Sequence, residues 1–267
     1  MTRAMQEKQL SGTPIYYWIG GDARAESILF LHSAFSNHHC FDKQIDNFIR
    51  DNQVITMDLL GHGKSLQGQK GDGIEKTASY IYQILEENHI RKVHLVGVSM
   101  GTMLAQSFAN QYPERVTSLC CIGGYDINNF DKKMQKENSL SQAKLMMKAI
   151  FSIKWFAQGN RKISAYTSEA QEAFYQMNIE FKKRSFRYLA GLSKMVNQQE
   201  TQARDYPLLI ACGEYDAPLA LKAAKMWNEH EPESSLIIFE NAGHHVNIDV
   251  PEFFNETLHH FLLSTKQ

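Results

Sequence analysis

Residues 97–101 read Gly-Val-Ser-Met-Gly and place a serine between two glycines. The apolar run at residues 93–96 is typical of a buried strand, and residues 102–112 have a helical pattern. A serine on the sharp turn between them exposes its hydroxyl at the end of a sheet, and the glycines leave room for the crowded backbone. The helix start adds free N–H groups that face a developing negative charge. We therefore predict that Ser99 is a catalytic nucleophile; the alternative is that it only caps the helix.

A serine hydroxyl is a weak nucleophile, so Ser99 needs a base, and that base needs a group to orient it. Asp216 and His244 each follow closely after an apolar, strand-like run in the last quarter of the chain. The carboxyl ends of parallel strands meet along one edge of a sheet, where active sites form. We therefore predict that Ser99, Asp216 and His244 converge at this edge, with His244 as the base and Asp216 as the orienting acid.

Alternatives to these partners lie close to them in the sequence. His245 follows the predicted base directly, and we expect it to shape the loop instead. Asp126 follows the preceding core strand and stays open as an alternative orienting acid. A metal site is not predicted, because the nearby histidines lack ligand spacing; they are His38, His39 and His62.

The elements that must position these residues are short apolar runs alternating with helical stretches. We expect strands at residues 28–31, 54–57, 93–96, 116–122, 208–212 and 236–239. We expect helices at residues 74–89, 102–112 and 251–263. Near-continuous apolar strands separated by helices predict an α/β fold, with a mostly parallel central sheet covered by helices on both faces.

The alternation stops from residue 126 to about residue 204, where the sequence is helix-like and rich in Lys, Gln, Met and aromatic residues. We therefore predict one core domain formed by residues 1–125 and 205–267. The helical segment, residues 126–204, is predicted to be a cap inserted after the sixth core strand. Its apolar side chains are candidates to line an acyl pocket or to pack the cap itself; they are Met146, Met147, Phe151, Trp155 and Phe156.

The composition limits the classes of function and partner. Hydrophobic residues make up 43% of the 267 residues and charged residues 21%, an ordinary globular mix. The net charge of −1 gives no reason to expect nucleic acid or an anionic membrane as a partner. Residues 1–10 are too polar for a signal peptide, and no apolar run reaches the ~18 residues of a membrane span. The cysteines lack metal spacing, so we expect reduced core cysteines in a cytoplasmic protein; they are Cys40, Cys120, Cys121 and Cys212.

Further motifs carry a resemblance to a known family. Residues 31–35 read Leu-His-Ser-Ala-Phe after a strand, and residues 58–65 read Asp-Leu-Leu-Gly-His-Gly-Lys-Ser. Residues 242–244 read Ala-Gly-His, with Asn247, Pro251 and Phe253 following. Together with the order Ser, Asp, His along the chain, these motifs resemble the α/β-hydrolase superfamily. The chain is most similar to its small esterases, lactonases and C–C hydrolases that carry a helical cap.

The resemblance implies a role for each site residue. Ser99 would attack an acyl carbonyl, His244 would accept its proton, and Asp216 would fix the imidazole tautomer. The backbone N–H groups of Ala34 and Met100 would form the oxyanion hole. The chain departs from the family pattern in two places: Ser33 and Thr102 stand where glycine is common.

The resemblance therefore implies a cofactor-independent serine hydrolase that cleaves a small carboxylic ester, thioester or lactone through an acyl-enzyme. Its expected partner is a small acyl substrate, with no nucleic acid, membrane or metal, and the chain is expected to be a monomer or homodimer. The alternative is a ligand sensor of the same fold with slow turnover. A third possibility is intramolecular proton transfer or perhydrolysis. The serine argues against the relatives that use aspartate at this turn.

Overall fold

The computed structural model describes residues 4–68, 71–197 and 204–265. One sheet of eight strands runs through the molecule in the order β1-β2-β4-β3-β5-β6-β7-β8. From β4 to β8 all neighbouring strands pair in parallel, and β1 and β2 pair antiparallel at one edge. The strand bounds are β1 Gln6–Gln9, β2 Tyr16–Gly20, β3 Ser27–Leu31, β4 Gln53–Met57, β5 Val93–Val98, β6 Val116–Ile122, β7 Leu208–Gly213 and β8 Ser235–Phe239.

Helices cover both faces of this sheet. The helix bounds are α1 Asp42–Phe48, α2 Thr77–Glu87, α3 Met100–Gln111, α4 Lys132–Phe151, α5 Ile153–Ser164, α6 Ser168–Glu180, α7 Phe186–Leu189, α8 Pro218–His230, α9 Val246–Asp249 and α10 Pro251–Ser264. Helices α2, α3 and α8 pack in one apolar cluster with Leu29 and Leu31 of β3. Helices α1 and α10 pack in a second cluster with Ile28 and Phe30 of the same strand. Alternate side chains of β3 thus point to opposite faces and bury both layers.

All six strands expected from the sequence are present, and the helices expected after them lie within one to three residues of their expected bounds. The prediction of a mostly parallel α/β sheet is confirmed. The hairpin of β1 and β2 was not expected. All four residues of β1 are exposed, so this strand has no apolar alternation that a sequence reading can detect.

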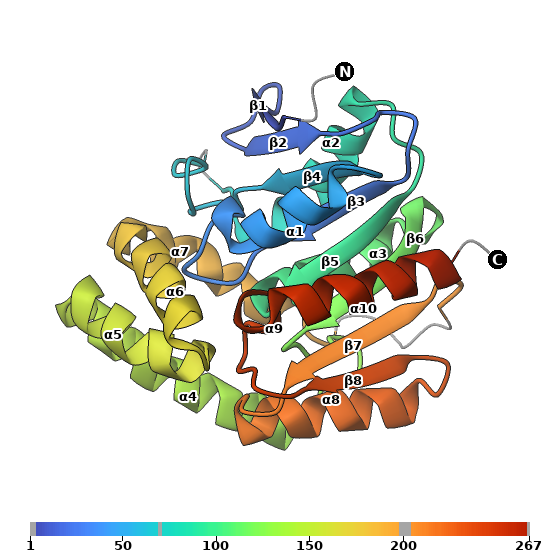
Figure 1. The fold of residues 1–267 in the computed structure, drawn as a ribbon. Helices are drawn as coiled ribbons and strands as arrows, with labels where there is room; N and C mark the ends of the chain where they lie inside the picture. The colour runs from blue at the N-terminus through green and yellow to red at the C-terminus, as the bar shows by residue number, and fades with distance from the viewer. Residues whose placement is uncertain (1–3, 69–70, 198–203, 266–267) are drawn as a thin grey trace.

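Helices α4 to α7 occupy the chain between β6 and β7, and no strand occurs among the described residues there. In Figure 1 they lie together to one side of the sheet. A small apolar cluster joins them to the core, because Phe35 packs with Phe156 and Phe181. Residues 198–203, at the end of the predicted insertion, lie outside the described residues, and the function of these helices as a cap stays a prediction.

The cysteine side chains lie in the core as free thiols. The four cysteines are buried and none forms a disulfide. Among the described residues, no helix combines the length and the apolar character that spanning a bilayer requires.

The start of α3 lies very close to the ends of β3 and β5. A Cβ atom on Gly101 would overlap the carbonyl oxygen of Leu31, and a Cβ atom on Gly97 would overlap the backbone of Gly101. Both neighbouring groups are backbone, one at the end of β3 and one in the first turn of α3, so they cannot move aside as a flexible side chain would. Glycine at both positions is therefore a packing requirement of the turn that carries Ser99.

We expect Gly101→Ala to lower the free energy of unfolding by about 1–3 kcal/mol, because the added methyl group overpacks this junction. Gly159→Ala is the matched control, since its nearest neighbour is the flexible ammonium end of Lys148 at 3.2 Å. A helical glycine replaced by alanine gains up to about 1 kcal/mol of helix propensity. Urea unfolding of both variants measures the difference, and equal stability of the two would contradict the packing requirement.

Candidate active site

Ser99 occupies a strained turn between β5 and α3. Its backbone has φ 53° and ψ −111°, a conformation that is rare outside glycine. Its N–H donates to the carbonyl oxygen of Ile122 at the end of β6, at 2.8 Å. Its side chain makes no capping hydrogen bond to α3, in contrast to the alternative that Ser99 only caps the helix. The surrounding sheet maintains this strained backbone conformation, and the hydroxyl of Ser99 makes no hydrogen bond to the helix.

His244 and Asp216 form a hydrogen-bonded pair at the same edge of the sheet. The Nδ1 atom of His244 lies 2.9 Å and 3.0 Å from the two carboxylate oxygens of Asp216. Asp216 is buried and also accepts from the N–H of Ala217 at 2.7 Å. With Nδ1–H donating to the carboxylate, Nε2 is left as the acceptor that a general base requires.

The end of β6 brings this pair beside Ser99. Gly123 follows Ile122 and has φ 59°, and a Cβ atom there would come within 2.7 Å of Nδ1 of His244. Ser99 bonds to the preceding carbonyl, so Ser99 and His244 border the same two-residue segment. No hydrogen bond joins Ser99 to His244 among the described residues. Such contacts are often long before substrate binds.

The pair shifts the pKa values of its members in opposite directions. Burial alone would lower the pKa of His244, but the charge of Asp216 and its hydrogen bond outweigh this effect and raise it above its ordinary value. Burial alone would raise the pKa of Asp216, but the charge and hydrogen bond of His244 lower it below its ordinary value. The structure therefore favours an ionised Asp216 beside an imidazole of increased basicity.

Asp126, the alternative acid, has other partners. Its carboxylate lies 3.7 Å from the guanidinium of Arg204 and accepts from the N–H of Asn128 at 2.9 Å. Burial raises the pKa of Asp126 above its ordinary value. Asp126 makes no bond to His244 among the described residues, so the geometry favours Asp216 as the orienting acid.

The loop after β3 carries the predicted oxyanion donor. Neither the N–H of Ala34 nor that of Met100 donates to an acceptor within the described part of the chain. Two N–H groups without a protein acceptor are what an oxyanion hole needs. Phe35 has φ 65°, its carbonyl accepts from the side chain of Asn178 at 3.2 Å, and its ring packs edge-on against Phe156. Helices α5 and α6 thus hold the loop that carries Ala34.

Ser33, the departure from the family pattern, lies in a buried hydrogen-bond network. The Nδ1–H of His245 donates to the carbonyl oxygen of Ser164 at 2.9 Å, so its Nε2 accepts from the hydroxyl of Ser33 at 2.8 Å. Burial lowers the pKa of His245 to about 3, which keeps the ring neutral and this arrangement fixed. His245 therefore links α5 to the loop after β3, a contact that sequence reasoning missed because its partner lies 212 residues away.

His32 stabilises the same loop from below. Its Nδ1–H donates to the carbonyl oxygen of Ser33 at 2.7 Å, and its Nε2 accepts from the N–H of Leu59 at 3.0 Å. Burial lowers the pKa of His32 to about 4, so the ring is neutral. With both ring nitrogens engaged, His32 has a structural function.

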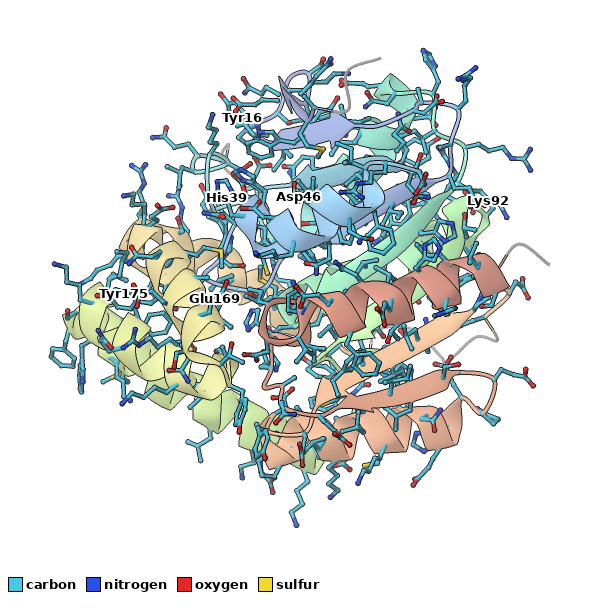
Figure 2. The ribbon with its side chains drawn as sticks, viewed as in Figure 1. Tyr16, His39, Asp46, Lys92, Glu169 and Tyr175 are labelled. Atoms are coloured by element: carbon cyan, nitrogen blue, oxygen red, sulfur yellow. The ribbon has the colours of Figure 1, made fainter. Side chains whose placement is uncertain are left out.

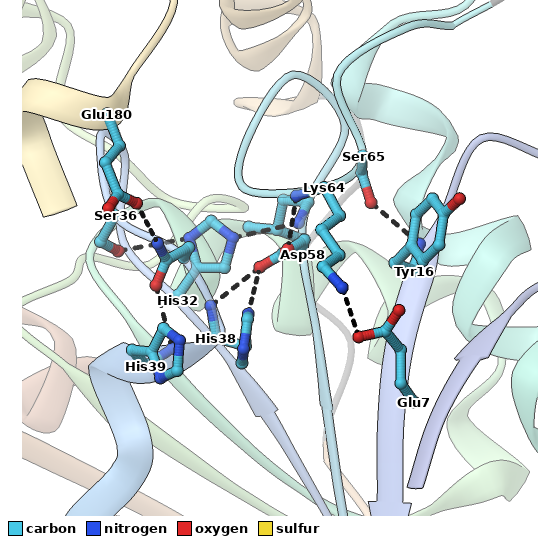
Figure 3. A network of polar contacts seen from close by, with 12 residues as sticks. Glu7, Tyr16, His32, Ser36, His38, His39, Asp58, Lys64, Ser65 and Glu180 are labelled. Carbon is cyan, nitrogen blue, oxygen red and sulfur yellow. Dashed lines mark hydrogen bonds and ion pairs between the residues drawn. The ribbon is translucent and has the colours of Figure 1, made fainter.

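Asp58 connects two turns near this loop, as Figure 3 shows. Its carboxylate accepts from the N–H and the ring of His38, both at 2.9 Å, and from the N–H of Lys64 at 2.7 Å. A Cβ atom on Gly63 would overlap this carboxylate. The histidines considered as possible metal ligands bond to other groups of the protein. Among the described residues, no three or more His, Cys, Asp or Glu side chains lie close enough together to hold a metal ion.

The predicted pocket residues of the insertion do not share one environment. Phe156 is fully buried against Phe35, but Met147, Phe151 and Trp155 are more than half exposed. The side chain of Met146 lies outside the described residues. The expectation that these side chains line one acyl pocket is therefore wrong for the exposed residues.

A hollow of about 590 Å³ on the surface contains none of the predicted site residues. It is bordered by Tyr16, Lys64 and Arg184, among others. The candidate site is thus identified by its hydrogen bonds and its place in the sheet.

Comparison with known proteins agrees with this geometry. A Bacillus subtilis (strain 168) protein, provisionally named a 2-succinyl-6-hydroxy-2,4-cyclohexadiene-1-carboxylate synthase, is 26% identical, covering 91% of this chain and 93% of its own. A monoacylglycerol lipase of Homo sapiens is 25% identical over 93% of this chain and 79% of its own. The solved structure of a thermophilic esterase from Thermogutta terrifontis superposes with a TM-score of 0.81 at 18% identity, covering 99% of this chain and 100% of that one.

The family itself is shown by a sequence profile. The profile of the alpha/beta hydrolase fold matches residues 26–251, which include Ser99, Asp216 and His244. The resemblance inferred from the motifs is confirmed over most of the chain. The protein belongs to the α/β-hydrolase family.

Proposed function

We propose that this protein is a serine hydrolase that cleaves a small carboxylic ester through an acyl-enzyme. The observation that carries the proposal is the bond between His244 and Asp216, placed beside the strained turn of Ser99. A buried, ionised carboxylate that orients a basic imidazole is what a serine nucleophile needs.

The proposed reaction has two halves, acylation and deacylation, and the same groups act in both. The hydroxyl oxygen of Ser99 attacks the carbonyl carbon as Nε2 of His244 takes its proton, and the oxyanion accepts from the N–H groups of Ala34 and Met100. The imidazolium then returns the proton to the leaving alkoxide. In the second half a water loses its proton to His244 and attacks the acyl carbon. The bond between this carbon and the Ser99 oxygen then breaks as the imidazolium returns the proton to that oxygen, which releases the acid and regenerates the Ser99 hydroxyl.

The names of the relatives support an ester as the substrate class. They include a monoacylglycerol lipase and, at the level of fold, an esterase. The Bacillus relative is named for a different reaction, so the fold alone does not fix the chemistry. A serine on a strained turn beside a basic imidazole, with two nearby N–H groups that have no protein acceptor, favours acyl transfer among these reactions.

We expect wild-type protein to hydrolyse p-nitrophenyl esters, from acetate to decanoate, over many turnovers, and Ser99→Ala to abolish this turnover. Asp216→Asn should lower kcat by about 10⁴-fold, by analogy with other triads, because the imidazole loses its orienting charge. Asp126→Asn is the matched control and should retain most activity. A single stoichiometric burst would favour a ligand sensor, and a larger loss in Asp126→Asn would reassign the acid.

The pH dependence follows from the raised pKa of His244. His244 accepts a proton only when neutral, so kcat/KM should fall as the pH drops through its pKa. Since Asp216 raises this pKa, the midpoint should lie above the ordinary value of about 6.5. In Asp216→Asn burial remains and the raising charge is lost, so the midpoint should move down. Rates measured from about pH 5 to 9 test both statements, and a midpoint that rises in the variant would contradict them.

Ser33→Ala tests whether the link to His245 positions the oxyanion loop. The variant leaves Nε2 of His245 buried without a donor, which should cost about 1–3 kcal/mol of stability. We expect kcat to fall with little change in KM, because the loop donor acts mainly in the transition state. Ser118→Ala, which removes a buried serine–histidine bond of 2.8 Å to His94 outside this loop, is the control. An unchanged kcat in Ser33→Ala would show that this bond does not position the loop.

A further inference from the structure

Large apolar side chains are exposed on the two outer helices of the insertion. Leu140, Met147 and Phe151 of α4 and Trp155 and Ile163 of α5 are each between 54% and 72% exposed. A solvated helix face is normally polar, and clustered exposed apolar residues mark interaction sites. These five side chains therefore require an explanation that the proposed hydrolysis does not supply.

The exposed side chains belong to one continuous face. Leu140, Met147 and Phe151 are seven and four residues apart, which places them on one side of α4. Helix α5 packs along α4, and the ammonium of Lys148 lies 5.8 Å from the ring of Trp155. Figure 1 shows α4 and α5 on the outer side of the insertion, away from the sheet. We call this surface the α4–α5 face.

The two helices that form the α4–α5 face are strongly basic. Among the described residues of α4 and α5 the only acidic side chain is Glu137, and the basic ones are Lys132, Lys133, Lys136, Lys148, Lys154, Arg161 and Lys162. Arg161 is engaged by Glu172 at 2.8 Å and by the ring of Tyr175, labelled in Figure 2.

The acidic side chains of α6, which packs on α5, leave this charge largely uncompensated. Glu172 pairs with Arg161, and Glu180 accepts from Asn37 of the core at 3.3 Å. Glu169, labelled in Figure 2, is exposed at the start of α6. The chain as a whole has a net charge of −1, so its average conceals this local excess of positive charge.

We propose that the α4–α5 face docks on the surface of an anionic lipid bilayer. Basic helices with exposed Trp, Phe and Leu lie in the interface of a membrane, with apolar groups below the headgroups and lysines beside the phosphates. A second copy of this face would bring two basic surfaces together and is disfavoured by repulsion. An acidic, water-exposed partner would satisfy the lysines and leave the apolar side chains uncovered. The bilayer satisfies both groups at once.

This docking is peripheral and goes beyond the proposed hydrolysis. It also replaces the expectation, drawn from net charge alone, that an anionic membrane is no partner. The lipid is identified by its negative headgroup charge, so phosphatidylglycerol vesicles are a sufficient probe.

The test is co-sedimentation of the full chain with vesicles of phosphatidylcholine, with and without about one third phosphatidylglycerol, at low and high salt. We expect binding to the anionic vesicles that falls at high salt. Lys154→Glu with Lys162→Glu should reduce the partition coefficient at least about tenfold, because two lysines leave the headgroup region. The matched control is Arg91→Glu with Lys92→Glu, which makes the same charge change at the exposed position labelled Lys92 in Figure 2.

A second face variant, Phe151→Asp with Trp155→Glu, removes apolar groups and adds two negative charges; its control is Phe253→Asp with Leu263→Glu, which makes the same charge change at two exposed apolar residues of α10. We expect the first variant to lose binding and the second to keep it. Circular dichroism and thermal unfolding verify that every variant folds. Absence of binding to anionic vesicles at low salt would overturn the proposal. So would equal binding by the face variants and their controls, or a wild-type dimer in sedimentation velocity that Phe151→Asp with Trp155→Glu dissolves.

Discussion

The close approach of α3 to the ends of β3 and β5 is the constraint on which the site depends. Because Gly97 and Gly101 carry no Cβ, the helix begins within one residue of the strand and forces Ser99 into a left-handed conformation. The end of β6 provides the carbonyl oxygen of Ile122, which accepts from the N–H of Ser99. It is followed by Gly123, which has no side chain and so leaves room for His244. Ser99 and His244 are thus brought together by rigid backbone contacts, and the carboxylate of Asp216 orients the His244 ring.

A second layer of neutral, buried histidines supports this arrangement. His32 and His245 each use both ring nitrogens, and burial keeps their pKa values far below neutral pH. They differ in this from His244, whose pKa Asp216 raises. Among these three rings, only the one bonded to a carboxylate has a raised pKa.

The sequence was sufficient to predict the parallel sheet, because buried parallel strands are continuous apolar runs. It was also sufficient to predict the sheet edge at which Ser99 lies, because the glycines around Ser99 mark a turn that few other residues permit. It was insufficient where the determining contact is tertiary. The bond of Ser33 to His245 joins residues 212 positions apart, and β1 has only exposed polar side chains. Likewise Phe156 and Phe151 have similar chemistry, but only packing decides that the first is buried and the second exposed.

The helical insertion helps to fix the geometry of the loop after β3. Ser164 and Asn178 both belong to the insertion, and each holds a residue of the loop after β3, one through His245 and the other at the carbonyl of Phe35. A chimera that exchanges these helices for those of a relative would therefore alter the loop backbone in addition to the substrate cavity. An exchange of these helices therefore needs to keep the carbonyl acceptor at Ser164 and the amide donor at Asn178, because without them the loop after β3 would be misaligned.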